Sequence, residues 1–296
     1  RVHESGEEEF IAKVFLAFLV WQSLVVLWQI AGRLSGIGFD PVSRYGAEVP
    51  ESYTLMLTGT YYNSNDLATT VGAIFAFFVL LKGRFPLLSN WGVILCVFLA
   101  VCTASRAVLL FMIVSTLYFA FSRSVLKAIL IVIVGTCLSL LVFFGLTYYF
   151  QELGFVARIL DRVFSIIRIL TDGVYSDNSM SLRLVSYLQF LRNLDVLGWG
   201  SFKLKDYSIF LVSLGPRFEL MSVNPHSFIV EVGYWLGWAG LTFWIFFMVM
   251  MASRNFGSVL YVLFSFFMLS MVSSSVFNNF MFIIVVFALF IFSKKK

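Results

Sequence analysis

The feature that most constrains this chain is a series of eight apolar runs separated by polar gaps. The runs cover residues 14–30, 67–81, 91–103, 107–121, 128–150, 227–251, 259–276 and 280–292. A bilayer core is about 30 Å thick and is spanned by about 20 helical residues. Only 12% of the residues are charged, whereas a soluble domain carries about 25%. We therefore predict an all-α polytopic membrane protein with about eight transmembrane helices, forming a single membrane domain over residues 1–296.

The basic residues predict how the chain is oriented. Lys and Arg in short loops mark the cytoplasmic side of a membrane, and here they follow the second, fourth, sixth and eighth runs. These residues are Lys82, Arg84, Arg123, Lys127, Arg254 and 294–296. The opposite gaps, 32–66, 104–106, 151–226 and 277–279, are then expected to face outward. Because the charges form no continuous basic face, the net charge of +5 does not indicate nucleic-acid binding.

The first residues and the cysteines give two further expectations. The chain begins with Arg1, and its acidic stretch at 4–9 lacks the features of a signal peptide. We expect that further N-terminal helices precede it. Cys96, Cys102 and Cys137 lie in or beside apolar runs without metal-ligand spacing, so neither a disulfide framework nor a metal site is expected.

The second and fourth runs are short and begin at polar residues. They start beside Asn65 and Asp66 and beside Ser105 and Arg106, and each apolar run rises only about 22 Å. Polar ends of short helices sink below the membrane surface, where they are tolerated around a water-filled cavity. The sequence predicts a polar pocket open to the outside. Asn65 and Asp66, with Asn63, either line this pocket or only cap the second helix.

The outer loop 151–226 contains two predicted amphipathic helices, at 155–170 and 182–194. A helix with one apolar and one polar side is typical of a membrane surface. The apolar side of the first comprises Ile159, Leu160, Val163, Phe164, Ile167 and Leu170, and the polar side Arg158, Asp161, Arg162, Ser165 and Arg168.

Arg106 stands at the predicted N-terminal end of the fourth helix. The helix dipole is positive there, so a cation is disfavoured unless an anion binds with it. A guanidinium beside free helix N–H groups makes a strong phosphate site. The alternatives are an arginine that reaches lipid headgroups or one that pairs with Asp66.

His226 lies at the predicted outer mouth of the sixth helix. Asn224 suits the N-cap and Pro225 the first helical position. The positive helix end favours a neutral imidazole that can accept a proton, although a merely hydrogen-bonded interfacial histidine fits equally well. Glu231, about one and a half turns further along, either holds an arginine or is a neutral structural group.

Several enzyme motifs are absent from the sequence. There is no phosphate-binding P-loop, no nucleophile elbow, no His-Glu-x-x-His zinc motif and no Asp-x-Asp pair. The chemistry that remains is a metal-free and cofactor-free transfer in which arginines stabilise a departing phosphate and a histidine handles a proton.

The order of the motifs resembles the O-antigen ligase and polymerase superfamily of membrane glycosyltransferases (Wzy/WaaL-type), over about residues 61–251. Its short motifs are matched, in order, by 62–68 (Tyr-Asn-Ser-Asn-Asp-Leu-Ala), 103–107 (Thr-Ala-Ser-Arg-Ala), 181–183 (Ser-Leu-Arg), 197–200 (Leu-Gly-Trp-Gly), 224–226 (Asn-Pro-His), Glu231, Gly233, Gly237 and Gly240. The resemblance implies a GT-C-like helical fold in the bacterial inner membrane, with its active site facing the periplasm. This chain departs from many members of the superfamily at Ser227, where those members have asparagine.

The resemblance also implies a reaction. A glycan would move from an undecaprenyl diphosphate carrier to an acceptor hydroxyl, with Arg106 and Arg183 gripping the diphosphate and His226 acting as general base. Arg183 enters through the resemblance, because on its own it is one of several loop arginines. The bilayer, the lipid-linked oligosaccharide and other polysaccharide assembly proteins are the implied partners.

The acceptor is left open. Another repeat unit would make the protein a polymerase, lipid A core a ligase, and a protein serine or threonine a protein glycosylase. We favour a polymerase because no element is dedicated to docking a protein or core lipid. Two other classes remain: a transporter or flippase for an anionic precursor, which usually shows repeat-related broken helices, and a non-enzymatic scaffold of an envelope complex.

Overall fold

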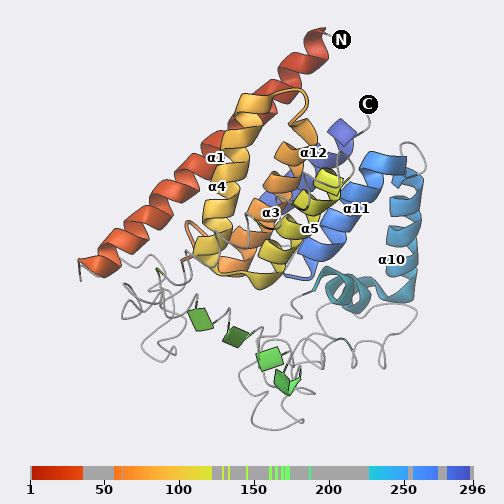
Figure 1. The fold of residues 1–296 in the computed structure, drawn as a ribbon. Helices are drawn as coiled ribbons and strands as arrows, with labels where there is room; N and C mark the ends of the chain where they lie inside the picture. Colours follow the sequence, from red (N-terminus) through yellow and green to blue (C-terminus); the bar gives the residue numbers. More distant parts are fainter. Residues whose placement is uncertain are drawn as a thin grey trace. The chain divides into compact units, whose positions relative to one another are not determined.

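The computed structural model describes residues 2–35, 57–61, 63–121, 227–252, 256–272 and 279–293, with positions 129, 133, 145, 160, 161, 164, 165, 168, 169, 171–173 and 187 (Figure 1). Throughout these residues the regular structure is helical and no strand occurs. The chain divides into two compact units, Arg1–Ile166 and Ile167–Lys296. Each unit is described separately.

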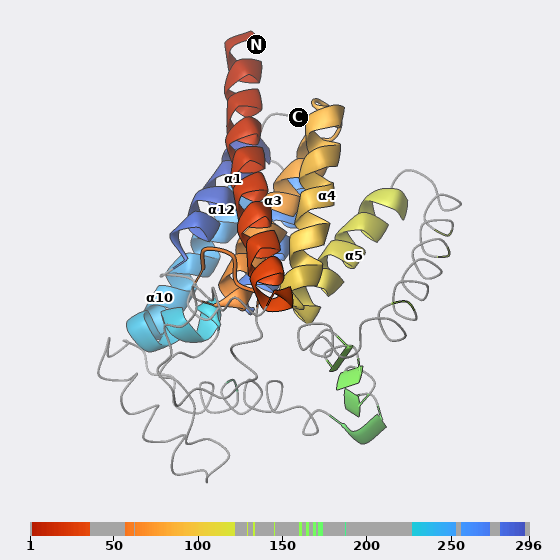
Figure 2. The same cartoon turned by 90° about the vertical axis from the view of Figure 1, so that its left-hand side faces the viewer.

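The described part of the first unit contains four long helices: α1 (Val2–Leu34), α3 (Ser64–Leu81), α4 (Pro86–Thr103) and α5 (Arg106–Phe121). Short connections make consecutive helices antiparallel, and only residues 82–85 separate α3 from α4, and 104–105 separate α4 from α5. Helices α3 and α5 therefore run parallel and begin at the same end of the unit (Figures 1 and 2). We call this end, which also holds residues 57–61, the site end.

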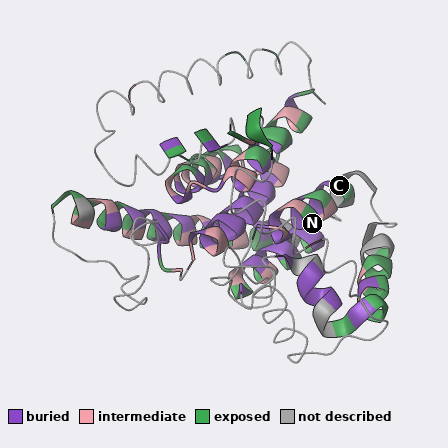
Figure 3. Cartoon of the chain, turned by 90° about the horizontal axis from the view of Figure 1, so that it is seen from below, coloured by how far each residue is buried: buried purple, intermediate pink, exposed green. Residues whose placement is uncertain are grey.

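Helix α3 forms the core of the first unit. Buried residues make up 78% of α3, against 33% of the apolar windows of α1 and α4; Figure 3 colours the described residues by burial. The Phe77 ring meets Phe15 of α1 edge-on at 4.9 Å between centroids, and the Phe75 ring meets Phe111 of α5 at 6.4 Å. Aromatic contacts of this kind hold α3 between its neighbours.

Helix α1 presents a narrow buried stripe, repeating every three or four residues as a helix packed on a helical bundle requires. The stripe consists of Glu8, Ala12, Phe15, Leu19, Gln22, Ser23, Val26 and Gln29. Three of its four polar residues, Glu8, Gln22 and Gln29, have a partner outside α1. The Glu8 carboxylate accepts hydrogen bonds from the Arg84 guanidinium through both of its oxygens.

Four predicted helices of the first unit, 14–30, 67–81, 91–103 and 107–121, are confirmed with changed bounds. The run 14–30 is the middle of a longer helix, because the acidic stretch at its start is also helical. Glu8 is buried there by its pairing with Arg84, and Glu9 bonds Lys13 one turn later at 2.7 Å. The run 91–103 begins five residues earlier, at Pro86, a residue well suited to a first helical turn.

The count of eight transmembrane helices remains a prediction. The described part of the chain holds three helices that are long and apolar enough to cross a membrane, and four shorter apolar helices. Helix α5, with 16 residues, rises about 24 Å and is shorter than a bilayer core of about 30 Å. The predicted fifth helix, 128–150, lies outside the described residues except for three helical positions.

The second unit contains α10 (Phe228–Ala252), α11 (Phe256–Ser270) and α12 (Phe280–Ser293). The Phe266 ring of α11 lies between Trp244 of α10, at 5.3 Å, and Phe282 of α12, at 5.8 Å. We expected one continuous helix over 227–251, but α10 is interrupted at Gly237, where φ is 64° and ψ is −161°. Glycine adopts this conformation without a Cβ clash, and the first part of α10 turns away from the second (Figure 1).

Candidate active site

The N-terminal turn of α3 is fixed by a side-chain cap. Asn63 has the extended backbone of an N-cap, and its side-chain oxygen accepts the Asn65 N–H at 2.9 Å. The Asn63 carbonyl accepts the Asp66 N–H at 3.1 Å. Asn63 therefore fills the capping role, while the partly exposed Asn65 and Asp66 form the first turn. An acidic residue in this position is favoured by the positive helix end.

Tyr61 ties the segment before α3 to the helix itself. Its hydroxyl donates to Thr70 Oγ1 at 3.2 Å, and the Thr70 hydroxyl donates to the Asp66 carbonyl at 3.0 Å. Burial raises the pKa of Tyr61 to about 12; the Asp66 charge adds to this rise and the Thr70 hydrogen bond opposes it. Tyr61 is thus a protonated donor at neutral pH.

The connection between α4 and α5 places Arg106 at a helix start. Ala104 has a left-handed backbone, φ 51°, and ends α4, while the Ser105 carbonyl accepts the Leu109 N–H at 3.0 Å and closes the first turn of α5. Arg106 is the first residue of α5. The tight turn predicted at 104–106 and the location of Arg106 at the helix N-terminus are confirmed.

Arg106 bonds a residue of the segment 151–226. Its Nη1 donates to Ser165 Oγ, and Ser165 is only 3% exposed. The sequence predicts Ser165 on the polar side of the 155–170 helix and Phe164 on the apolar side that faces the membrane. Ser165 is buried together with its bond to Arg106, a partner that the pattern does not predict, while Phe164 is 45% exposed.

The parallel arrangement of α3 and α5 brings three predicted site residues to the site end. Asn65 and Asp66 belong to the first turn of α3, and Arg106 to the first turn of α5. The two helices pack against each other. Two positive helix ends and a guanidinium at one end of a helical unit suit an anionic ligand such as a phosphate.

Two of the other predicted site residues, Arg183 and His226, lie outside the described residues. Glu231 belongs to the second unit, in the first turn of α10, where its N–H donates to the Ser227 carbonyl at 2.8 Å. Its side chain is buried. The Ser227 hydroxyl is also buried and has no hydrogen-bond partner.

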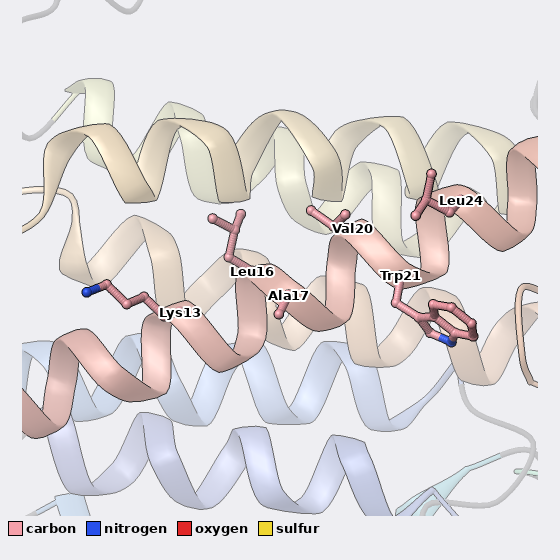
Figure 4. Close-up of a pocket in the computed structure, with 6 residues that line it drawn as sticks. All are labelled: Lys13, Leu16, Ala17, Val20, Trp21 and Leu24. Carbon is pink, nitrogen blue, oxygen red and sulfur yellow. The ribbon is translucent and has the colours of Figure 1, made fainter.

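A groove lies on the face of α1 (Figure 4). Its volume is about 380 Å³. It is lined by Lys13, Leu16, Ala17, Val20, Trp21 and Leu24. None of the predicted site residues lines it, and Lys13 is already bonded to Glu9.

Three residues that hold the site end are absent from the predicted site. Ser165 is predicted only as part of the polar side of the 155–170 helix, and Gln22 and Gln29 lie inside the apolar run 14–30. Their spacing was a usable signal, because two glutamines seven positions apart in an apolar helix lie on one face, and buried amides need hydrogen-bond partners.

Comparison with known families assigns the chain to one of them. A family model described as O-antigen ligase matches residues 91–245, just over half of the chain. The match includes Arg106, Ser165, Arg183, His226 and Glu231. Neither the curated proteins nor the solved structures gave a match. With more than half of its length matched, including the start of α5 and its arginine, this chain belongs to the O-antigen ligase family.

Proposed function

We propose that this protein is a membrane glycosyltransferase that moves a glycan from an undecaprenyl diphosphate carrier to an acceptor hydroxyl. Its proposed role is that of an O-antigen or capsular repeat-unit polymerase. The observation that carries the proposal is the position of Arg106. It lies in the first turn of α5, where the buried Ser165 hydrogen-bonds it, and it belongs to the region matched by the family model. The segment 151–226 is proposed as an outward-facing loop of a single membrane domain in the bacterial inner membrane.

The proposed reaction is a direct displacement at the sugar carbon bound to the diphosphate. The carbon–oxygen bond to the diphosphate breaks, and a bond to the acceptor oxygen forms on the opposite face, which inverts the configuration. Negative charge grows on the leaving diphosphate, where Arg106, Arg183 and the N–H groups of α5 stabilise it. His226 takes the proton of the acceptor hydroxyl.

The remaining predicted residues are assigned to substrate binding. Asn65 and Asp66 offer an amide and a carboxylate to sugar hydroxyls at the site end, and Glu231 does the same from α10. Such groups fix the orientation of the donor before the reaction. The mechanism needs no metal, because the arginines and helix ends neutralise the leaving group. We therefore expect product formation to be unaffected by EDTA, and a strict requirement for magnesium would contradict the mechanism.

The experiment uses purified protein in lipid nanodiscs with a synthetic undecaprenyl-diphosphate-linked oligosaccharide. Gel electrophoresis and mass spectrometry should reveal a ladder of repeat units if the protein is a polymerase. Single additions to lipid A core or to a protein would replace the polymerase assignment with a ligase or protein glycosylase. His226→Ala should abolish product while the protein stays folded.

Two outcomes would remove the proposal. Near-normal glycan chain length in the His226→Ala protein would exclude the general base. Uptake of the intact substrate into proteoliposomes, with no glycosidic product, would identify a transporter.

A further inference from the structure

The segment before α3 is held by two glutamines of α1. Residues 58–61 form a turn closed by the Tyr61 N–H, which donates to the Thr58 carbonyl at 3.0 Å. The turn lies beside α1 (Figure 2), within hydrogen-bonding distance of Gln22 and Gln29. Both glutamines are 1% exposed and lie inside an apolar helix of membrane-spanning length. We call these two residues and the turn the glutamine clamp.

Gln29 binds the first half of the turn. Its side-chain oxygen accepts two backbone N–H groups, from Thr58 at 3.2 Å and from Gly59 at 3.1 Å. Its side-chain nitrogen donates to the Gly59 carbonyl at 3.2 Å and to Thr58 Oγ1 at 3.4 Å. The oxygen faces only donors and the nitrogen only acceptors, so one orientation of the amide satisfies all four contacts.

Gln22 binds the second half in the same way. Its side-chain oxygen accepts the Thr60 N–H at 2.9 Å, and its nitrogen donates to Thr60 Oγ1 at 2.6 Å. Non-helical backbone at membrane depth is stable only where protein groups satisfy its N–H and C=O groups. The two amides do this for the N–H groups of three consecutive residues, Thr58 to Thr60, and for the Gly59 carbonyl.

Gly59 shows how closely the turn is pressed against α1. Its φ is +58°, and a Cβ built on it would lie 2.3 Å from Gln22 Oε1 and 3.1 Å from a methyl group of Leu67. A side chain at this position would therefore be strained by its backbone and would also displace the amide. The glutamine clamp requires glycine here.

The clamp is connected directly to the first turn of α3. Tyr61, the last residue of the turn, packs its ring against Phe18 of α1 and bonds Thr70 of α3. Asn63, two residues later, caps the turn that contains Asn65 and Asp66. The position of α1 is thus transmitted to the start of α3 through the contacts of the described residues 58–61 and 63.

We infer that Gln22 and Gln29 are positioning residues of the glycan-transfer site. They hold the 58–61 turn against α1 and so fix the first turn of α3, with Asn65 and Asp66, at the end where α5 presents Arg106. This inference rests on the proposed function. It assigns a role in donor binding to a helix that lies outside the region matched by the family.

The first test compares two substitutions on the same stripe of α1. Gln29→Met keeps the length of the side chain and removes the amide, and Leu19→Met introduces the same residue at a buried position without polar contacts. With the synthetic undecaprenyl-diphosphate oligosaccharide, Gln29→Met should raise KM about tenfold while kcat stays within about threefold. Leu19→Met should leave both constants unchanged.

A second variant approaches the clamp from the turn. Gly59→Ala leaves both glutamines in place but moves the turn away from Gln22, so it should raise KM in the same way as Gln29→Met. Thermal unfolding of all variants is measured in parallel. A loss of kcat that follows a loss of thermal stability, with KM unchanged, overturns the positioning role.

A third measurement does not depend on activity. Thr58→Cys is introduced after replacement of Cys96, Cys102 and Cys137, and its reaction with a water-soluble maleimide is timed. Thr58 is buried within the clamp. Modification of the cysteine should therefore be slow in the protein that also carries Leu19→Met, and at least about tenfold faster in the protein that also carries Gln29→Met. Equal rates overturn the inference.

The two proposals fail in different ways. If the wild type makes product and Arg106→Ala loses it, equal KM values for Gln29→Met and Leu19→Met overturn the positioning role alone. If the wild type forms no glycosidic product, the proposed function falls, and the positioning role falls with it.

Discussion

The two ends of the first helical unit are held by different kinds of contact. At the site end, neutral side chains make the contacts that hold the 58–61 turn and cap α3: the amides of Gln22 and Gln29, and Asn63. At the opposite end, one buried carboxylate, Glu8, is paired with Arg84 in the loop before α4. The first arrangement fixes the backbone of a turn, whereas the second joins two charges that are costly to separate.

The difference predicts two separable kinds of defect. Amides can be buried without a counter-ion and give precise backbone positions, so damage at the site end should alter catalysis more than folding. A buried ion pair depends on both partners, and removing one leaves an uncompensated charge. Damage at the opposite end should therefore alter folding more than catalysis.

The largest effect is expected for Arg106→Ala. Loss of a group that stabilises charge on the leaving diphosphate should lower kcat by about 10³-fold, with little change in the unfolding temperature. Arg106→Lys keeps the charge but not the planar guanidinium, so its kcat should lie between those of the wild type and Arg106→Ala. Steady-state kinetics on purified protein provides the measurement, and wild-type turnover in Arg106→Ala would refute the role.

Arg84→Ala tests the opposite end. Leaving Glu8 buried without its partner should lower the free energy of unfolding by about 3 kcal/mol, seen as a lower midpoint of thermal unfolding. Lys82→Ala, an exposed residue of the same loop, is the control and should have no effect. Activity per folded molecule should be preserved in both. A selective loss of activity in Arg84→Ala would remove the contrast between the ends.

Ser165→Ala should have a smaller effect at the site end. Without the serine hydroxyl, Arg106 keeps its charge but loses one fixed hydrogen bond, so kcat should fall about tenfold. Ser115→Ala is the matched control, because Ser115 is buried on α5 and its hydroxyl has no partner. Equal activities of the two variants would show that Ser165 does not position Arg106.

The smallest effect concerns alkaline pH. Because the pKa of Tyr61 is raised to about 12, the unfolded chain loses this proton near pH 10 while the folded chain keeps it. The free energy of unfolding should therefore fall as pH rises from 10 to 12, and at pH 11 it should be about 1 kcal/mol lower than at pH 8. Tyr61→Phe should lose this part of the decline, measured as the difference in unfolding temperature between pH 8 and pH 11.

Much of the fold could be predicted because apolar runs report directly on helices in a bilayer. The short polar link at 104–106 also predicted the position of Arg106 at a helix start. The bounds of α1 could not be predicted in the same way. Glu8 is polar by local sequence, and its burial depends on Arg84, 76 positions away.

The contacts of the site end were less predictable for the same reason. Gln22 and Gln29 bond residues 29 to 38 positions away, and Ser165 bonds Arg106 across 59 positions. Periodicity assigns a face to each residue but not a partner. The kink at Gly237 could have been predicted, since a glycine inside an apolar run permits a left-handed conformation. Arg183 remains a prediction from the motif order, and His226 remains a prediction from its expected place at a helix start and from the motif order.

The seven-residue separation of Gln22 and Gln29 makes the length of α1 between them as important as their identity. Each added residue would rotate everything beyond it by about 100° around the helix axis. One insertion between these positions would swing Gln29 out of register with Gln22 and toward the lipid. Evolution can thus vary the lipid-facing residues of this segment freely, but it can change the number of residues only together with the 58–61 turn.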